Sequence, residues 1–538
     1  MKKQTFTLIL FLNINLLQAQ NPLVKEWDYR YGGTGIDYLN SIQQTSDGGY
    51  ILGGQSRAGG GDKTPPFWGG KDYYAVKLDS LGIKQWDRSF GGLDYNYFYC
   101  LQQTNDGGYI LGGFSDSDSG GCKSQHNRDT IPPYTDDYWI VKIDSLGNQQ
   151  WDKTFGGKRN DILTSLAQTT DGGYILGGRS ESGISGDKTQ NCRGWYDYWA
   201  IKIDSLGNKQ WDKRFGGSTE DELYSVQQTF DGGYILGGWS TSDSSGDKTE
   251  NCRGSQDYWI VKINSSGIKQ WDKTFGGSSF DNLCSLTQTV DGGYIAGGLS
   301  GSGISGDKTE PNCFSNYTDY WIVKMDALGN KQWDRDIGGM HSEDDFGNIS
   351  QTSDGGYLIA GTSYSDGGCE KSEFNLGLEQ TWIIKTDSLG IKQWDKTIFT
   401  IGHDEQGLAL QSGYCYVFAN STAANIGGYK TQPQWDTLCS AGWCYSDFWI
   451  IKFCDTTLTT SINQISNSQS SILIYPNPTN AVLSLSLNHE ENIAVTNLLG
   501  EIVLQKTTEG KVELDVSFLS AGIYFIKAGN EVRKFVKE

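Results

Sequence analysis

The sequence predicts an all-β chain: a seven-bladed β-propeller closed by its N- and C-terminal strands, followed by a small C-terminal β-sandwich. Two observations support this prediction. A Trp-Asp phrase occurs seven times between Trp27 and Trp394, at intervals of 59 to 65 residues, and such a fixed period is typical of stacked supersecondary units. Residues 472–538 lack that phrase and instead show short alternating apolar segments, which indicates a second domain.

Each repeat resolves into four short strands, named a to d. In the copy that ends at Trp271, these are expected at 223–229, 234–238, 258–263 and around Trp271. Strand a alternates apolar and polar residues, as a half-buried strand does. Asp231-Gly232 suits a tight hairpin between strands a and b, and a long polar loop joins strands b and c. No copy sustains the apolar spacing of a helix.

The two ends of the array complete one blade. Strand d at Trp27 has no a, b or c before it, and residues 447–453 read as a strand c without a following d. Pairing the first strand with the last repeat gives seven blades and removes the open sheet edge. The Gly-Gly after strand b and the later aromatic pair and Trp resemble the kelch repeat, although kelch units are shorter. The repeats also look like those of exported propeller proteins of Bacteroidetes.

Composition excludes several classes of protein. The chain carries 44 basic and 64 acidic residues, a net charge of -20, and so acidic a surface repels phosphate backbones, which excludes nucleic acid as a partner. Mean hydropathy is -0.49. Beyond one short N-terminal apolar run, no transmembrane segment is expected in the mature chain.

The N-terminus has the order of features of a secretory signal peptide. Basic Met1-Lys2-Lys3 precedes the apolar run Phe6–Ile14, and Ala19 offers a small residue for cleavage. Residues 1–19 are therefore expected to be removed on export, leaving the propeller at residues 20–455. The alternative, a buried strand, fits less well because the repeats begin only at Trp27.

The C-terminus resembles a known sorting signal. A Ser/Thr-rich linker is expected at 456–471, before the second domain at 472–538. Three ordered motifs there resemble the type A sorting domain of the type IX secretion system; their marker residues are Tyr475, Pro476, Asn477, Pro478, Gly500, Gly522 and Tyr524. The resemblance implies contact with the type IX machinery and passage across the outer membrane of a Bacteroidetes-type bacterium. It also implies later removal of the domain, with release or surface attachment.

Binding residues are expected on the face that carries the b-to-c loops. In a meander of four strands the b-to-c and d-to-a connections lie on the same face, and variable loops on a rigid scaffold commonly carry function. Aromatic side chains in or beside these loops suit a sugar or a protein surface, or else pack the loops onto the blades. The candidates are Trp68, Trp195, Trp239, Trp435 and Trp443.

An acidic residue recurs at the d-to-a junction of nearly every blade. One interpretation is a ring of oxygen ligands for Ca²⁺ at the channel; the favoured alternative is a carboxylate that caps backbone N–H groups of its own blade. The residues are Asp37, Asp161, Asp221, Asp281, Asp344 and Asp404. The phrase Ser-Gly-Asp-Lys-Thr, as at Ser185–Thr189, resembles a phosphate-binding loop only superficially and is read as turn chemistry.

The eleven cysteines suggest loop staples in an exported protein, and Cys439 and Cys444 are close enough in sequence to pair. The four histidines are scattered, and no catalytic residue is assigned. The sequence therefore predicts a secreted or surface-attached, non-catalytic binding protein for a glycan or another surface protein. The alternative is a polysaccharide-degrading enzyme that acts at the same face, for which two carboxylates would suffice.

Overall fold

The computed structural model describes residues 23–129, 134–314, 317–340, 342–435 and 445–455, and in the C-terminal part 473–475, 479, 481–486, 491–497, 502–508, 510–528 and 531–537. It divides into two compact units, with the boundary between Cys454 and Asp455. The expected signal peptide (1–19) and linker (456–471) lie outside the described residues.

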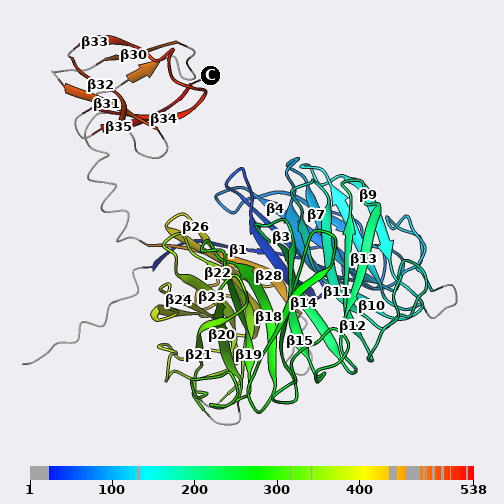
Figure 1. Ribbon diagram of the computed structural model, residues 1–538. Helices are drawn as coiled ribbons and strands as arrows, with labels where there is room; N and C mark the ends of the chain where they lie inside the picture. Colours follow the sequence, from blue (N-terminus) through cyan, green and yellow to red (C-terminus); the bar gives the residue numbers. More distant parts are fainter. Residues whose placement is uncertain are drawn as a thin grey trace, which may run out of the picture. The chain divides into compact units, whose positions relative to one another are not determined.

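The first unit is a seven-bladed β-propeller (Figure 1). Blades 1 to 3 comprise β2 (Asp37–Gln44), β3 (Tyr50–Ser56), β4 (Asp72–Leu78) and β5 (Lys84–Phe90); β6 (Asn96–Gln103), β7 (Tyr109–Ser115), β8 (Asp137–Ile143) and β9 (Gln149–Phe155); and β10 (Asp161–Gln168), β11 (Tyr174–Ser180), β12 (Asp197–Ile203) and β13 (Lys209–Phe215). Blades 4 to 6 comprise β14 (Asp221–Gln228), β15 (Tyr234–Ser240), β16 (Asp257–Ile263) and β17 (Lys269–Phe275); β18 (Asp281–Gln288), β19 (Tyr294–Ser300), β20 (Asp319–Met325) and β21 (Lys331–Ile337); and β22 (Asp344–Gln351), β23 (Tyr357–Ser363), β24 (Gln380–Thr386) and β25 (Lys392–Ile398).

Blade 7 is built from both ends of the unit. Its sheet contains β26 (Asp404–Ser412), β27 (Cys415–Thr422) and β28 (Asp447–Asp455), and its outer strand is β1 (Leu23–Tyr31). Figure 1 shows the blue N-terminal strand beside the yellow and orange strands of this blade. The predicted closure by terminal strands is confirmed.

The a strands form the inner ring of the propeller. Each contacts the a strand of the next blade, from β2 through β26 and back to β2. Polar side chains cross the junctions: Gln103 N donates to Gln43 Oε1 at 2.6 Å, and at the closing junction Leu39 N donates to Ser421 Oγ at 2.7 Å. These bonds satisfy backbone groups that have no partner within their own sheet.

A buried Trp–Asp hydrogen bond lies inside blades 2 to 7. In blade 4, Trp259 on strand c donates its indole N–H to Asp272 on strand d at 3.1 Å, and Thr249 in the b-to-c loop donates both its N–H and its hydroxyl to the same carboxylate. Asp272 is 5% exposed. The Asp of the Trp-Asp phrase therefore joins two strands and the long loop of its blade.

The Trp of the same phrase contacts the following blade. Trp271 meets Tyr294 edge-on, with ring centroids 5.9 Å apart, and Tyr258 donates its hydroxyl to the carbonyl of Trp321 at 2.9 Å. Gly237 on strand b faces the next blade, where a Cβ would lie 2.7 Å from Leu286 Cδ2, and a Cβ on Gly238 would lie 1.9 Å from the carbonyl oxygen of Glu222 on strand a of the same blade. The Gly-Gly of strand b is thus required by packing.

The a-to-b hairpins carry an ion pair between an exposed aspartate and a buried lysine. Gly232 has φ +78°, a conformation that glycine adopts without strain. Beside it, Asp231 pairs with Lys262 at 2.9 Å. Partial burial opposes ionisation, but the hydrogen bond from Thr229 and the Lys262 ammonium outweigh it and lower the pKa of Asp231 to about 2. Five other blades have the same pair.

The second unit is a small β-sandwich of two sheets. One contains β29 (Leu473–Tyr475), β30 (Val482–Ser486) and β33 (Lys511–Asp515); the other contains β31 (Glu491–Thr496), β32 (Ile502–Thr508), β34 (Gly522–Ala528) and β35 (Glu531–Lys537). Leu483, Ile493, Val495, Ile526 and Phe535 are buried in its core. The sandwich after the propeller is as the sequence predicts.

The Trp–Asp bond gives a direct stability test. We expect Asp272→Ala to lower the free energy of unfolding by about 3 kcal/mol, because the Trp259 and Thr249 donors lose a buried acceptor. Urea unfolding followed by tryptophan fluorescence measures this. The control is Asp243→Ala at an exposed loop position, which should change stability by less than about 0.5 kcal/mol. Equal effects of the two changes would contradict the role assigned to the bond.

Candidate functional site at the channel opening

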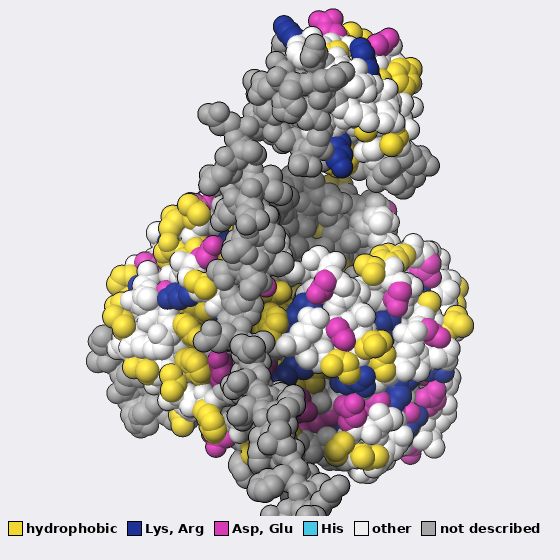
Figure 2. All heavy atoms as spheres, turned by 90° about the vertical axis from the view of Figure 1, so that its left-hand side faces the viewer, with side chains coloured by type: hydrophobic (Ala, Val, Ile, Leu, Met, Phe, Trp, Pro, Cys, Tyr) yellow, Lys and Arg dark blue, Asp and Glu magenta, His cyan; other side chains and the backbone are white. Residues whose placement is uncertain are grey.

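The b-to-c loops and d-to-a junctions meet on one face of the propeller, here called the long-loop face. Lys71 at the end of one long loop pairs with Tyr95 at the next d-to-a junction, and Tyr196 pairs with Glu220 in the same way. The inner strands also begin on this face, so their first residues surround the channel opening. Figure 2 shows acidic, basic and hydrophobic side chains interspersed over one side of the propeller.

The acids predicted to form a ring begin the inner strands and are buried. Asp161 is 0% exposed, and its Oδ2 accepts hydrogen bonds from Gly157 N–H at 2.7 Å and from Ser182 Oγ at 2.9 Å. Asp37, Asp221, Asp281, Asp344 and Asp404 are equally buried. These surroundings match the capping alternative, and a Ca²⁺ role for the six residues stays a prediction.

The Gly-Asp-Lys-Thr loops place a lysine beside this acid. Lys188 is 2% exposed, and its ammonium donates to Ser180 Oγ at 2.6 Å. Burial disfavours the ionised form of Asp161. The hydrogen bond from Ser180 and the charge of Lys188 favour that form, but burial outweighs them, so the pKa of Asp161 rises to about 6. The phrase therefore serves to anchor the loop on its own blade.

The predicted aromatic residues differ widely in exposure. Trp195 is 77% exposed, Trp68 and Trp435 are 39% exposed, and Trp239 is only 7% exposed. Trp435 is held by the Arg30 guanidinium over its ring and by an indole N–H bond to Asp62 at 2.8 Å, while Trp239 packs edge-on against Tyr196. Trp443 lies outside the described residues.

A pocket of about 420 Å³ opens among blades 5 to 7 on the long-loop face. It lies where the inner strands β22 and β26 begin. Its lining includes two rings, three carboxylates and an amide, supplied by Phe346, Tyr364, Asp345, Glu379, Glu405 and Gln406. Gln406 has φ +55°, which a non-glycine residue rarely adopts.

Glu379, His403 and Glu405 form a cluster at this pocket, with ligand atoms within 4.8 Å of one another. Nδ1 of His403 contacts Glu379, and Nε2 lies 3.2 Å from Glu405. Glu379 is 1% exposed, and burial, then the charges of Glu405 and Asp345, raise its pKa to about 8. Sequence reasoning missed this cluster, because the three positions vary among the blades and have no consensus residue.

Aromatic and charged residues occupy the opposite part of the inner ring. Tyr97 on β6 stacks on Phe114 with centroids 4.7 Å apart, and Lys71 lies 4.3 Å from the centre of the Tyr97 ring. Arg179 and Glu222 form an ion pair at 2.6 Å across blades 3 and 4. These side chains are already engaged with one another, so their surface is less available than the pocket of blades 5 to 7.

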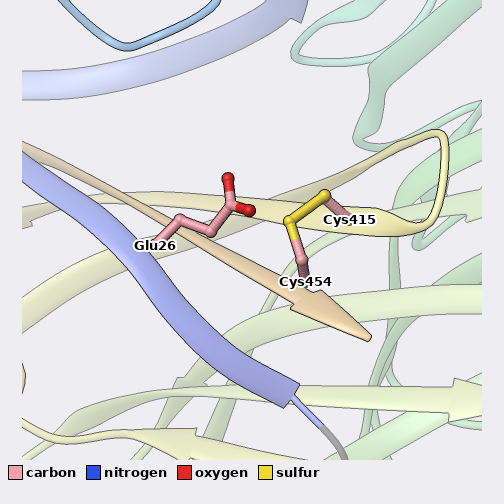
Figure 3. A group of neighbouring side chains, drawn as sticks. All are labelled: Glu26, Cys415 and Cys454. Carbon is pink, nitrogen blue, oxygen red and sulfur yellow. A yellow bond between two sulfur atoms is a disulfide. The ribbon is translucent and has the colours of Figure 1, made fainter. Parts of the chain in front are cut away.

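Two disulfides brace the half of the propeller that contains blades 5 to 7. Cys313–Cys369 links the long loops of blades 5 and 6, as expected for a loop staple. Cys415–Cys454 joins β27 to β28, and Figure 3 shows the Glu26 carboxylate beside it. Because the two sulfurs are bonded to each other, this group offers no thiolate to a metal ion. Cys439 and Cys444 lie outside the described residues.

The C-terminal unit matches a known family. Residues 473–538 match the secretion system C-terminal sorting domain. This segment is a sorting domain. It directs the protein through type IX secretion to the cell surface or the extracellular space, and so engages the secretion machinery.

Most marker residues of the sorting motifs lie outside the described residues. These are Pro476, Asn477, Pro478 and Gly500. Tyr475 ends β29 and Gly522 begins β34. Tyr524 on β34 stacks on Phe535 with centroids 5.7 Å apart, and its hydroxyl donates to the carbonyl of Ser520 at 3.0 Å.

Other similarities are weaker. The regulatory protein FlaEY of Caulobacter vibrioides is 26% identical over 165 residues, which is 30% of this chain and 17% of that protein. A Dyadobacter fermentans protein of unknown function is 10% identical, over 81% of this chain and 100% of that one, with a TM-score of 0.42. The polysaccharide lyase Uly1 is 10% identical over 80% and 99%, with a TM-score of 0.41. No activity is inferred from them.

The described residues include no helix with the length and apolar character needed to cross a membrane.

The buried acids predict how stability depends on pH. The pKa of Asp161 and of Asp221 rises from 3.8 to about 6 on folding. A carboxyl with a higher pKa in the folded state stabilises the fold below its unfolded pKa, and this contribution is lost as pH rises through the folded value. We therefore expect thermal unfolding to occur at a lower temperature at about pH 7.5 than at about pH 5.

A matched variant isolates this effect. Blade 2 has Asn96 at the equivalent position, where its side-chain amide donates to the carbonyl of Lys71 at 2.9 Å. The double change Asp161→Asn and Asp221→Asn should fold and should reduce the pH dependence of the melting temperature between those two values, as calorimetry would measure. An unchanged pH dependence would show that these carboxyls do not control it.

Proposed function

We propose that this protein is a secreted or surface-attached adhesion protein of a Bacteroidetes-type bacterium, with a kelch-like propeller that binds a glycan without catalysis. The observation that supports this proposal is the open pocket at the channel opening. It combines rings with carboxylate and amide groups, a lining that suits a small number of sugar units.

The chemistry of the lining favours a sugar over an apolar ligand. Carboxylates such as Asp345 accept hydrogen bonds from pairs of hydroxyl groups, and the amide of Gln406 both donates and accepts. Tyr364 is 41% exposed and offers a flat face for stacking. On the same face, Trp195 extends the surface available to a longer chain.

A polysaccharide-degrading enzyme is the second candidate. Glycosidases need one carboxyl that keeps its proton near neutral pH and a second carboxylate nearby. The pKa of Glu379 is raised to about 8, and Glu405 lies close to it. This pair is the specific observation that favours catalysis.

We also propose the domain organisation given by the sequence. The signal peptide covers 1–19, the propeller 20–455, the linker 456–471 and the sorting domain 472–538. After translocation the sorting domain is removed, and the propeller is then released or held at the cell surface.

Binding and release of sugar should be measured together on a glycan and polysaccharide array with the full mature chain. We expect saturable binding without new reducing ends. Tyr364→Ala should weaken binding about tenfold, because an exposed ring at the centre of a site contributes much of its affinity. The control is Phe230→Ala. Phe230 lies in an a-to-b hairpin, on the face opposite the long-loop face, and is 73% exposed, so this change should leave binding unchanged.

The same assay separates the alternatives. Release of reducing ends that Glu379→Gln abolishes would replace the adhesion proposal with the enzyme. Equal loss of binding in Tyr364→Ala and Phe230→Ala would argue against the pocket as the site. Absence of any sugar binding would favour a protein partner.

A further inference from the structure

We propose that His403 and Glu405 bind a divalent transition-metal cation at the pocket, with Glu379 as the positioning residue for the imidazole. The inference starts from the two nitrogens of His403. Nδ1 contacts the carboxylate of Glu379, whereas Nε2 lies 3.2 Å from Glu405 on the side of the pocket. A metal-bound histidine commonly donates its other ring N–H to a carboxylate, which fixes the tautomer and the ring orientation.

Burial separates the roles of the two glutamates. Glu379 is 1% exposed, and its Oε1 lies against Nδ1 of His403. The Glu405 side chain is 38% exposed and lines the pocket. An ion at Nε2 and Glu405 therefore has an open path to solvent, and water or a ligand hydroxyl can complete its coordination.

The charges around the cluster favour a bound cation. Glu379, Glu405 and Asp345 line one pocket, and the ion pairs of Glu379 and Glu405 found among the described residues are both with His403. Two carboxyl groups thus contact one imidazole, and a third, Asp345, lines the same pocket. Mutual repulsion of close carboxylates is relieved either by protonation or by a bound cation.

Comparison among the blades shows that the fold does not need these residues. Glu379 precedes strand c of blade 6, His403 precedes strand a of blade 7, and Glu405 is the second residue of that strand a. At the other junctions these three positions hold Lys71, Tyr95 and Tyr97; Asp136, Asn160 and Ile162; Tyr196, Glu220 and Glu222; Gln256, Phe280 and Asn282; Thr318, Glu343 and Asp345; and Ser446, Ile36 and Tyr38.

Every blade forms at those junctions with different side chains, and none of the other six combines an imidazole with two carboxylates. The buried acid at the start of strand a, by contrast, recurs and serves the blade. The imidazole and two carboxylates at this one junction are therefore not needed by the blade and are available to a bound ligand.

The donor set selects the class of ion. Imidazole nitrogen with carboxylate oxygen suits Zn²⁺ and related first-row cations, whereas Ca²⁺ and Mg²⁺ prefer oxygen ligands alone. The proposed metal site rests on the proposed function, because it lies in the pocket proposed for the glycan. The binding of the metal itself, however, is measured without any sugar, so failure of one proposal is distinguishable from failure of the other.

The test is equilibrium dialysis of the full mature chain against Zn²⁺, with Ca²⁺ and Mg²⁺ in parallel. We expect one Zn²⁺ per chain, not displaced by an excess of Ca²⁺. His403→Gln and Glu405→Gln should each weaken binding at least about tenfold. The control is His126→Gln, because His126 is an exposed histidine whose Nδ1 lies 2.9 Å from Asp118, and it should bind Zn²⁺ as the unchanged chain does.

The role of Glu379 needs a second readout. Glu379→Gln should weaken Zn²⁺ binding about 10- to 100-fold, and Glu379→Asp should restore part of that loss. With Co²⁺ as the probe, the visible absorption of the bound ion should disappear in His403→Gln and shift in Glu379→Gln. A merely structural role for Glu379 would leave the Co²⁺ spectrum unchanged.

Two results would overturn the proposal. One is absence of saturable Zn²⁺ binding by the unchanged chain, which would leave His403 as a bridge between two carboxylates. The other is equal Zn²⁺ affinity in Glu405→Gln and the unchanged chain. Glu405 is partly exposed, so this variant decides the matter even if His403→Gln fails to fold, and circular dichroism of each variant verifies folding.

Discussion

The hydrogen bond between the strand-c indole and the strand-d aspartate is the interaction on which the rest of the propeller depends. In blade 4 the Asp272 carboxylate accepts from Trp259, from Thr249 and from Lys269. One buried acceptor thus joins the outer two strands to the base of the long loop. In blade 1, Tyr74 donates its hydroxyl in place of the indole, at 3.2 Å from Asp87. Because each loop is anchored at its base, the residues between can vary without disturbing the blade.

Repetition explains which parts of the structure could be predicted. The four-strand unit, the Asp-Gly hairpin and the closing pair of terminal strands each leave a periodic mark in the sequence, so they could be derived from it. The site could not be derived in the same way. Asp344 and Asp345 are consecutive acids, yet the first is buried and the second is exposed. Strand pleating decides between them, and the residue at which the strand begins is visible only in the structure.

The cluster at the pocket illustrates a second limit. Glu379 and His403 belong to different blades, and composition gives no reason to associate them. The one signal in the sequence is that His403 is the only histidine at a junction position that otherwise holds Ile, Tyr, Asn, Glu or Phe. Blades 6 and 7 are also the least regular: Gln380 replaces the usual Asp at the start of strand c, and Gln406 adopts a positive φ. Disulfides stiffen this same region. The pocket therefore lies in the blades that depart most from the repeat and that the disulfides cross-link.

The way in which β1 completes blade 7 has a consequence for folding. Asp28 on β1 accepts hydrogen bonds from Thr431, which follows it by 403 residues. Contacts so distant in sequence form slowly, because a long loop must close before they contribute any stability. Six blades can assemble locally, one after another, but the seventh must wait until strands from both ends are present together. Until then the chain exposes two unpaired strand edges, at β27–β28 and at β1. Closure of the ring by docking of β1 onto β28 is therefore expected to be the last folding step.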